Sequence, residues 1–326
     1  MTEFAPEAWS PPKAPPLTGD FEENHRLRDA ELIEVPGTGP EDVAIDGTGN
    51  LFTGTDNGTI LRIDPGGSIT PIAKVGGRPL GIELHGDDLL VCNADLGLQL
   101  VSQTGAVEVL TDAVNGSPLK LTNNASVASD GSIYFTESST RWPLHEYASD
   151  LIEGQTTGRL IKRDPTGETT VLVDGLQFAN GVAFDSTEAS VFVAETGRYR
   201  IHRHWITGDR AGQTEIFVEN MPGFPDNLSF ADGTLWVAIA SPRQPPLDVM
   251  ASRTWMRHVV HRLPEAVQPA AVRHGMVFGY DETGAVTHNL QDPTGRVAIT
   301  TGVRASEGKL YVGSLSDSHI AVVDID

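Results

Sequence analysis

Four positions in the sequence carry an oxygen-bearing side chain just ahead of a half-apolar run that ends in a turn. They are Glu41 before VAID, Asn123 before ASVASDG, Asn180 before VAFD and Asp226 before LSFADG. Two carboxylates and two amide oxygens are hard ligands, which suit Ca²⁺ and also Mg²⁺ or Mn²⁺, whereas zinc usually takes histidine or cysteine. The set therefore predicts one divalent-cation site, provided that the fold brings the four positions together.

A simpler interpretation exists for each of these residues taken alone. Asparagine and aspartate are common at the starts of strands because their side chains bond to nearby backbone groups, and Asn180-Gly181 is also a hairpin signal. Recurrence at the same phase of four separated segments favours the shared site. Two carboxylates buried together without a cation would repel each other and raise a pKa.

A repeated pattern, a turn followed by a short β-rich run, supplies the elements that could bring the four positions together. The six runs are GNLFTG from Gly49, DDLLVCNA from Asp87, GSIYFTES from Gly131, EASVFVAE from Glu188, GTLWVAIA from Gly233 and GKLYVGSL from Gly308. Most are followed by a second run, so each unit contains several strands, which is typical of a propeller blade. The sequence thus predicts an all-β fold, a six-bladed β-propeller over residues 21–326. An N-terminal arm, residues 1–20, is expected to lie on the surface or to be disordered.

Two further segments complete the predicted ring. Residues 31–35 are expected to pair with residues 319–324 and so to close the propeller, which removes exposed sheet edges. The stretch at residues 245–272 has few glycines and helical spacing, which predicts a helical insertion over one face. Equivalent positions in the blades of a propeller converge on its axis, so the four oxygen-bearing side chains are expected to meet there.

The composition limits the partners of the chain. It carries 44 acidic and 23 basic residues, a formal net charge of −21, which argues against nucleic acid and against an anionic membrane surface. A small-molecule substrate is the expected partner. The sequence has no apolar run of transmembrane length and no secretory signal at its N-terminus, which predicts a cytoplasmic location. Cys92, the single cysteine, is expected to pack as a small hydrophobic side chain rather than to act as a nucleophile.

Several stretches of the chain resemble the strictosidine-synthase-like proteins, a branch of the calcium-dependent phosphotriesterase superfamily that also contains gluconolactonases and paraoxonases. The stretches are GPEDVAID, TGTDNGTILRI, GRPLGIEL, YFTESSTRW, FANGVAF, VAETGRYRIHRHWI, FVENMPGFPDN and KLYVGSL. The resemblance implies a six-bladed propeller, with a calcium ion in the shaft in the hydrolytic branches. It carries metal-ligand roles to Glu41, Asn123, Asn180 and Asp226, with Asn227 as a candidate additional contact to metal or substrate.

The chain departs from these relatives at three places. Relatives carry Asn-Asp where this chain has Asn123-Asn124, so the local hydrogen bonding is expected to differ. Paraoxonase-like enzymes carry a histidine in the stretch that here contains Leu80, so a histidine-assisted mechanism is not expected. Strictosidine synthases use a glutamate at a position that falls near Thr301, so their condensation reaction is not expected either.

Together these observations predict a metal-dependent hydrolase of a lactone or carboxylic ester, of the lactonase or arylesterase type. The cation would act as a Lewis acid on a carbonyl oxygen, and Asp226 is the candidate general base for water. Two alternatives remain, because one fold hosts many functions. One is a non-catalytic propeller that binds a small molecule and has a structural metal. The other is a strictosidine-synthase-like enzyme that forms C–N and C–C bonds.

Loops at the mouth of the shaft supply the candidate contacts with substrate. The candidate contacts are Glu137, Arg141, Trp142, His145 and His258. Glu137 opens a long loop after its strand, and Arg141, Trp142 and His145 lie on that loop. His258 lies in the predicted helical insertion, over the entrance.

Overall fold

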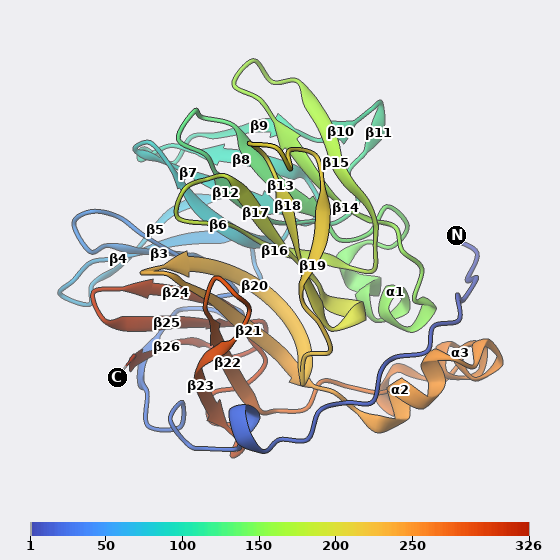
Figure 1. Ribbon diagram of the computed structural model, residues 1–326. Coiled ribbons are helices and arrows are strands. Elements are labelled where there is room, and N and C mark those ends of the chain that lie inside the picture. The colour runs from blue at the N-terminus through green and yellow to red at the C-terminus, as the bar shows by residue number, and fades with distance from the viewer. Residues whose placement is uncertain (1, 326) are drawn as a thin grey trace.

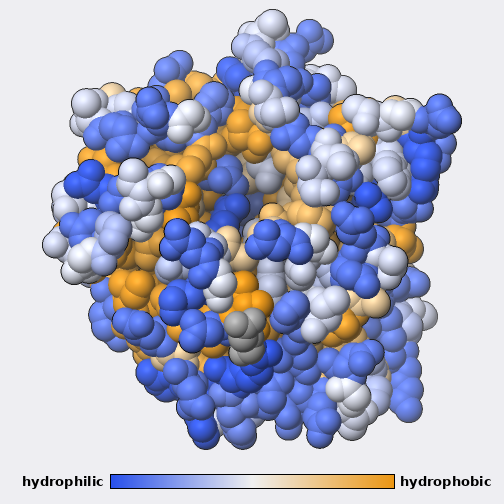
Figure 2. Space-filling model, turned by 60° about the vertical axis from the view of Figure 1, so that its left-hand side comes forward, coloured by the Kyte–Doolittle hydropathy of each residue, from blue (hydrophilic) through white to orange (hydrophobic). Residues whose placement is uncertain are grey.

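Six four-stranded antiparallel sheets surround a central shaft in the computed structural model, which describes residues 2–325 (Figure 1). In five of the described blades the strands follow one another in chain order from the axis outward. Figure 2 shows one face of the molecule, which is hollowed near its centre. The six-bladed propeller predicted from the repeats is confirmed.

The strands divide among the blades as follows. Blade one contains β2 (Val43–Ile45), β3 (Leu51–Gly54), β4 (Thr59–Ile63) and β5 (Ile69–Lys74). Blade two contains β6 (Pro79–His85), β7 (Asp88–Asn93), β8 (Gly97–Val101) and β9 (Val107–Thr111). Blade three contains β12 (Thr122–Val127), β13 (Ile133–Glu137), β14 (Gly158–Arg163) and β15 (Thr169–Leu176). Blade four contains β16 (Ala179–Phe184), β17 (Ser190–Glu195), β18 (Arg200–Trp205) and β19 (Thr214–Val218). Blade five contains β20 (Gly223–Ala231), β21 (Thr234–Pro242), β22 (Gly275–Tyr280) and β23 (Val286–Asp292). Blade six contains β24 (Thr300–Ser306), β25 (Lys309–Ser314), β26 (His319–Asp324) and β1 (Glu31–Glu34). A small hairpin of β10 (Ala113–Val114) and β11 (Ser117–Pro118) connects blades two and three.

Blade six closes the ring with strands from both ends of the chain. β1 pairs antiparallel with β26, so that Glu31 lies opposite Val322 and Glu34 lies opposite His319. The pairing predicted for these segments is confirmed. Because the outermost strand of this blade comes from the N-terminal part of the chain, backbone hydrogen bonds hold the two ends together and β26 has no exposed edge.

Large apolar side chains fill the space between the blades. Phe52, Phe135, Phe192 and Trp236, each from the second strand of a blade, are fully or almost fully buried. Successive residues of a strand point to opposite faces, and both faces of a blade are covered by neighbours, so these strands are apolar over most of their length. Cys92 in β7 is buried in one such cluster beside Phe135, as expected for a small hydrophobic side chain.

Three helices and the N-terminal arm cover one end of the shaft (Figure 1). They are α1 (Tyr147–Glu153), α2 (Pro245–Ala251) and α3 (Thr254–His261), with the 3-10 turns η1 (Gly19–Phe21), η2 (Leu144–Glu146), η3 (Thr196–Arg198) and η4 (Glu265–Val267) elsewhere in the chain. The predicted helical insertion is confirmed by α2 and α3. The sequence predicted a loop where α1 forms, because seven residues are too few for periodicity to reveal a helix. No helix in the part of the chain that the structure describes has the length and apolar character needed to cross a membrane.

The N-terminal arm lies in an extended conformation along these helices. The backbone N–H of Glu7 donates to the carbonyl of Glu153, and that of Trp9 donates to the carbonyl of Ala251, both at 3.0 Å. The buried Arg257 of α3 ties the segments together, since its guanidinium donates to the carbonyls of Glu7 and Glu153 at 2.8 Å and of Ala251 at 2.7 Å. Burial lowers the pKa of Arg257 to about 10. Arm, α1, α2 and α3 therefore form one hydrogen-bonded cover over the shaft.

Candidate metal centre at the end of the shaft

Each innermost strand brings a pair of consecutive residues to the shaft, and the six pairs form two layers. The first layer contains Glu41, Leu80, Asn123, Asn180, Asp226 and Thr301, and all six line one cavity. The second layer contains Asp42, Gly81, Asn124, Gly181, Asn227 and Gly302. In blades two to six the strand register shifts at the pair. A bulge of this kind bends a strand and re-aims its side chains, and in blade one the pair directly precedes β2.

Alternate members of the second layer are glycines because the shaft is narrow there. A Cβ atom at Gly81 would lie 2.8 Å from the Cα of Asn124, and one at Gly181 would lie 2.5 Å from the Cα of Asn227. A Cβ atom at Gly302 would lie 2.8 Å from the Cα of Asp42 in blade one. Only every second blade can therefore present a side chain in this layer.

Four side-chain oxygens in the two layers are buried without a hydrogen-bond partner. They are the Oδ1 atoms of Asn123, Asn180, Asp226 and Asn227. An unpaired buried oxygen costs free energy, and buried polar groups in native proteins are normally paired. A cation accepts lone pairs from several oxygens at once, so four unpaired oxygens next to the carboxyl group of Glu41 fit a bound metal ion.

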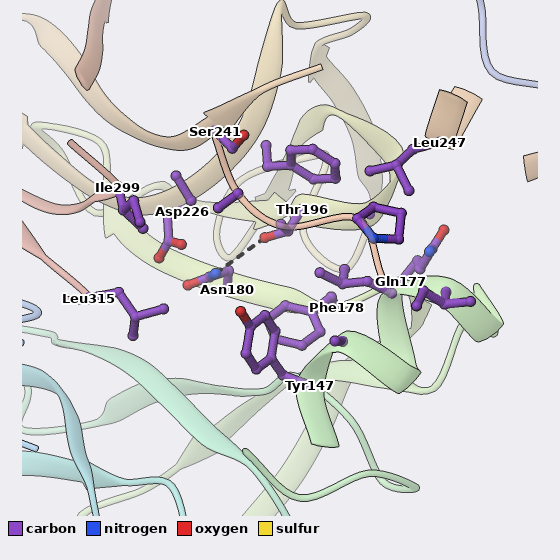
Figure 3. Close-up of a pocket in the computed structure, with 18 of the residues that line it drawn as sticks. Tyr147, Gln177, Phe178, Asn180, Thr196, Asp226, Ser241, Leu247, Ile299 and Leu315 are labelled. Carbon is purple, nitrogen blue, oxygen red and sulfur yellow. Dashed lines mark hydrogen bonds between the residues drawn. The ribbon is translucent and has the colours of Figure 1, made fainter. Parts of the chain in front are cut away.

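Two hydroxyl groups fix the orientation of two of the amides. Asn123 Nδ2 donates to Ser138 Oγ at 2.9 Å. Asn180 Nδ2 donates to Thr196 Oγ1 at 3.2 Å, the interaction marked by the dashed line in Figure 3. With the amide nitrogen held from behind, the Oδ1 atom is left free for a ligand in the shaft. Groups that orient metal ligands in this way commonly tune metal affinity.

Equivalent glutamates hold the strands that carry these two asparagines. Glu137 ends β13, and its carboxylate accepts from the backbone N–H of Lys120 at 2.8 Å and from Arg159 Nε at 2.7 Å. Glu195 ends β17 and accepts from the backbone N–H of Gln177 at 2.8 Å. Lys120 and Gln177 each stand three residues before an asparagine of the first layer. Glu137, a predicted substrate contact, is buried, its carboxylate positions a strand, and it is not among the described residues that line the cavity. The repeat of Glu followed by Ser or Thr, in YFTES and FVAET, is the signal that could have revealed this role.

Asp42 and Asn124 in the second layer differ from the first layer, because their oxygens have partners in the protein. Asp42 Oδ2 accepts from the N–H of Ile82 and from Asn124 Nδ2, both at 3.2 Å, and Asp42 Oδ1 accepts from the N–H of Val43 at 2.9 Å. Asn124 Oδ1 accepts from the N–H of Val182 at 3.0 Å. An aspartate at position 124 would have no N–H to donate. Asn124, at a position where relatives carry aspartate, thus donates a hydrogen bond to Asp42 across the shaft that two ionised carboxylates could not make.

Burial shifts the ionisation of the carboxyl groups in the shaft. Burial, with the negative charges of Asp226 and Asp42, raises the pKa of Glu41 well above its ordinary value. Burial likewise raises the pKa of Asp226 to about 8 and that of Asp42 to about 6. Asn227 Nδ2 donates to Glu41 Oε2 at 3.2 Å, and Thr301 Oγ1 donates to the backbone carbonyl of Glu41 at 2.8 Å. Carboxyl groups that ionise reluctantly alone do so readily when a cation compensates their charge.

The cavity beyond the first layer has a volume of ≈ 300 Å³ and a mostly apolar wall. Figure 3 shows the side chains of Asp226 and Asn180 close together, with the rings of Phe178 and Tyr147 near them along the same cavity. Trp9 of the arm completes the wall. A cavity of this size that is largely apolar, with a few convergent polar groups, is typical of a site for a small organic molecule.

None of the five predicted substrate contacts is among the described residues that line the cavity. Arg141 forms an ion pair of 2.9 Å with Glu153, and Trp142 Nε1 donates to the same carboxylate at 2.7 Å. The side chain of His145 is 75% exposed, and the ring of His258 packs against the arm. In this segment α1 turns Tyr147, Ala148 and Leu151 toward the shaft instead. Sequence spacing alone does not show which side of a loop faces inward.

The residues present suit a hard cation better than a zinc ion. Within residues 2–325 no group of three or more histidine, cysteine, aspartate or glutamate side chains could hold a metal. The shaft instead offers two carboxyl groups, of Glu41 and Asp226, together with amide oxygens. No histidine is found among the described residues that line the cavity. Calcium accepts such a mixture of carboxylate and amide oxygens.

The fold and the site together define the class of protein, a six-bladed propeller with a largely apolar cavity whose inner end carries side-chain oxygens. Two solved structures share this fold at low sequence identity. A gluconolactonase from Xanthomonas campestris superimposes with a TM-score of 0.67 and 16% identity, over 92% of this chain and 91% of its own. Regucalcin from Agrobacterium tumefaciens, a calcium-binding protein, has a TM-score of 0.63 and 14% identity, over 89% and 94%.

Closer relatives identify the family. The strictosidine synthase family matches residues 123–209, and the N-terminal region of strictosidine synthase-like proteins matches residues 19–63. The adipocyte plasma membrane-associated protein of Salmo salar is 35% identical over 350 residues, which covers 98% of this chain and 84% of that protein. The chain belongs to the strictosidine-synthase-like family, as the resemblance of its motifs predicted.

Proposed function

We propose that this protein is a divalent-cation-dependent hydrolase that opens a lactone or cleaves a carboxylic ester, with Ca²⁺ as its preferred ion. The observation that carries the proposal is a group of four unpartnered oxygens beside the carboxyl group of Glu41. Those of Asn123, Asn180 and Asp226 belong to residues that line the inner end of one apolar cavity, and that of Asn227 lies in the second layer. Calcium takes six to eight oxygen ligands. Five protein side chains therefore leave positions for water and for a substrate oxygen.

Each residue of the site would have a separate role in such a reaction. A bound ion would polarise the carbonyl group of the substrate as a Lewis acid. Asp226, whose carboxyl group lines the inner end of the same cavity, accepts a proton from the attacking water. Asn227 and Thr301 hold Glu41 in place as a ligand. Phe178 and its apolar neighbours bind the body of the substrate and exclude bulk water.

The structural relatives support this choice of reaction and ion. Gluconolactonase acts on a lactone and regucalcin binds calcium, and both use the propeller that this chain shares. Their identity to this chain is low, so the support rests on the common scaffold together with the oxygen set described above. The adipocyte proteins, at higher identity, fix the family and not the reaction.

A non-catalytic propeller that binds a small molecule is the second candidate. One observation favours it: among the described residues that line the cavity, the only carboxyl groups are those of Glu41 and Asp226, and both belong to the proposed ligand set. A base separate from the metal ligands is therefore lacking there. The synthase reaction has less support, since the neutral Thr301 occupies the blade-six position and is bonded to the backbone of Glu41.

Metal analysis and activity measurements on the same protein test the proposal. Metal-free protein is titrated calorimetrically with Ca²⁺, Mg²⁺ and Mn²⁺, and a panel of lactones and of aryl and alkyl esters is assayed with and without EDTA. We expect a single calcium ion per chain, hydrolysis that EDTA abolishes, and recovery when calcium is added. Asp226→Ala and Glu41→Ala lose both binding and turnover, whereas the surface variant His145→Ala keeps both.

Two outcomes contradict the proposal in different ways. Full hydrolytic activity in metal-free protein refutes the role of the ion. Calcium binding that raises the melting temperature, with no turnover of any compound in the panel, supports the binding propeller instead.

A further inference from the structure

Helix α3 exposes part of its apolar surface to solvent. Trp255 and Val259 are separated by four residues and share one face of the helix, and Leu263 lies just beyond its end. Their exposed fractions are 66%, 53% and 39%. The single residue that α3 buries is Arg257, at 3% exposure. The helix also carries Met256 and Val260, which are half-buried, so its apolar residues lie on two sides and one pair, Trp255 and Val259, faces solvent.

Hydrogen bonds hold the helix in this orientation. Arg257 is separated by two residues from both Trp255 and Val259, about 200° around the helix, and so points to the opposite side. Its guanidinium donates to the backbone carbonyls of α1, α2 and the arm. These hydrogen bonds fix the side of α3 that faces the protein, and they leave Trp255 and Val259 on the outer side.

Exposed apolar side chains are concentrated in this part of the molecule. Of the eleven large hydrophobic residues that are exposed in the described chain, six lie between residues 249 and 272. Besides Trp255, Val259 and Leu263, they are Val249, Val267 and Val272. Exposed apolar residues that gather in this way mark an interaction surface, whereas single ones scattered over a protein need no explanation.

The local charge is opposite to that of the whole chain. Residues 252–262 contain three arginines and two histidines and no carboxylate, in a protein with a net charge of −21. Arg253 and Arg262 are exposed at either end of the helix. The carboxylates of Glu3 and Glu7 belong to the arm, which packs against the other side of α3 through the stacking of its Phe4 on a histidine ring.

We propose that the outward face of α3, formed by Trp255, Val259 and Leu263, docks on a lipid surface that contains anionic lipid. A helix with tryptophan and aliphatic residues on one face and arginines at its borders lies in the plane of a lipid interface, with its apolar side chains inserted and its cations among the headgroups. The total charge of the chain disfavours such contact, but the exposed Arg253 and Arg262 border the apolar side chains, and residues 249–272 contain a single carboxylate, Glu265. Docking does not depend on the proposed reaction, although α1 and α2 of the same cover line the cavity.

Vesicle flotation with the full-length chain tests this proposal. Phosphatidylcholine vesicles with and without phosphatidylserine are used, and the tryptophan emission is followed in parallel. We expect wild-type protein to float with the mixed vesicles and its emission to shift to shorter wavelength, because Trp255 leaves water. The double variant Trp255→Ala/Val259→Asp should lose roughly tenfold or more of its affinity for vesicles. The matched control Val109→Asp changes an equally exposed apolar residue on the outer strand β9 and should bind as wild type.

Further variants separate the lipid surface from other occupants. Arg253→Glu/Arg262→Glu should weaken binding to the mixed vesicles and leave binding to pure phosphatidylcholine unchanged. Absence of wild-type binding to both vesicles overturns the proposal, as does an equal loss in the α3 variant and in Val109→Asp. Sedimentation analysis that finds a wild-type dimer, lost in the α3 variant, would assign the face to a second copy of the chain and also overturn it.

Discussion

Replacing Asp226 with asparagine separates the electrostatic cost of the shaft from its capacity to bind a cation. The two side chains have nearly the same shape, so the change removes one ionisable group and little else. Asp226 is buried together with Glu41, whose pKa is also raised by burial and by the charge of Asp226. In metal-free protein the variant should therefore be more stable than wild type at neutral pH, although it removes a residue of the proposed site.

The magnitude follows from the pKa of Asp226, which burial raises from 3.8 to about 8. Between these values the folded protein retains a proton that the unfolded chain has released, so the free energy of unfolding falls as the pH rises. A tenfold change in proton affinity corresponds to about 1.4 kcal/mol, so at pH 7 the destabilisation is on the order of 4 kcal/mol. It vanishes below the pKa of the unfolded chain, where both states hold the proton.

Urea unfolding in EDTA, from about pH 4 to about pH 8, measures this difference. The gap between Asp226→Asn and wild type should be near zero at the acidic end and should widen in favour of the variant as the pH rises. Asp46→Asn is a control of opposite sign, because hydrogen bonds from Asn50 and Thr48 outweigh burial and lower the pKa of Asp46 to about 2. That variant should be less stable than wild type by a margin that stays nearly constant from about pH 4 to about pH 8, because the contribution of Asp46 is lost only below the ordinary pKa of 3.8. Calcium at about 100 times its dissociation constant should stabilise wild type by about 2.7 kcal/mol and Asp226→Asn much less. A gap that does not vary with pH would refute the reasoning, since it would mean that Asp226 ionises normally in the folded protein.

Three other predictions concern the supports of the site and the core. Ser138→Ala should lower calcium affinity about tenfold, because Asn123 loses the hydroxyl that orients its amide, whereas Ser138→Thr should restore the affinity; calorimetric titration checks both. Arg257→Met should lower the free energy of unfolding by about 3 kcal/mol and speed hydrogen exchange at the backbone N–H of Trp9, because the cover loses its hydrogen-bonded tie; unchanged exchange would contradict this role. Cys92 should react with a thiol reagent only after unfolding, because burial excludes the reagent and raises the pKa of the thiol; rapid labelling of native protein would show that β7 opens easily.

Much of the fold was predictable because its signals are local. Each blade repeats a turn and a short apolar run, and the pairing of β1 with β26 follows once six units are counted. The four oxygen-bearing positions were found by their common phase, and the structure brings all four to one cavity. The positioning roles of Glu137 and Glu195 were missed, because a carboxylate that follows a strand looks the same whether it faces substrate or a backbone N–H.

The amino-acid sequence by itself determined the blade repeat, the oxygen chemistry of the shaft and the family. These properties depend on residue types and on short spacings, which a linear chain records directly. Only the tertiary structure decided which loop residues face the cavity, that Asn124 bonds to Asp42 across the shaft, and that α3 exposes Trp255 while it buries Arg257. Each of these outcomes depends on partners that are remote in the chain, and the free energy of a buried charge or amide is set by the partner that the fold places beside it.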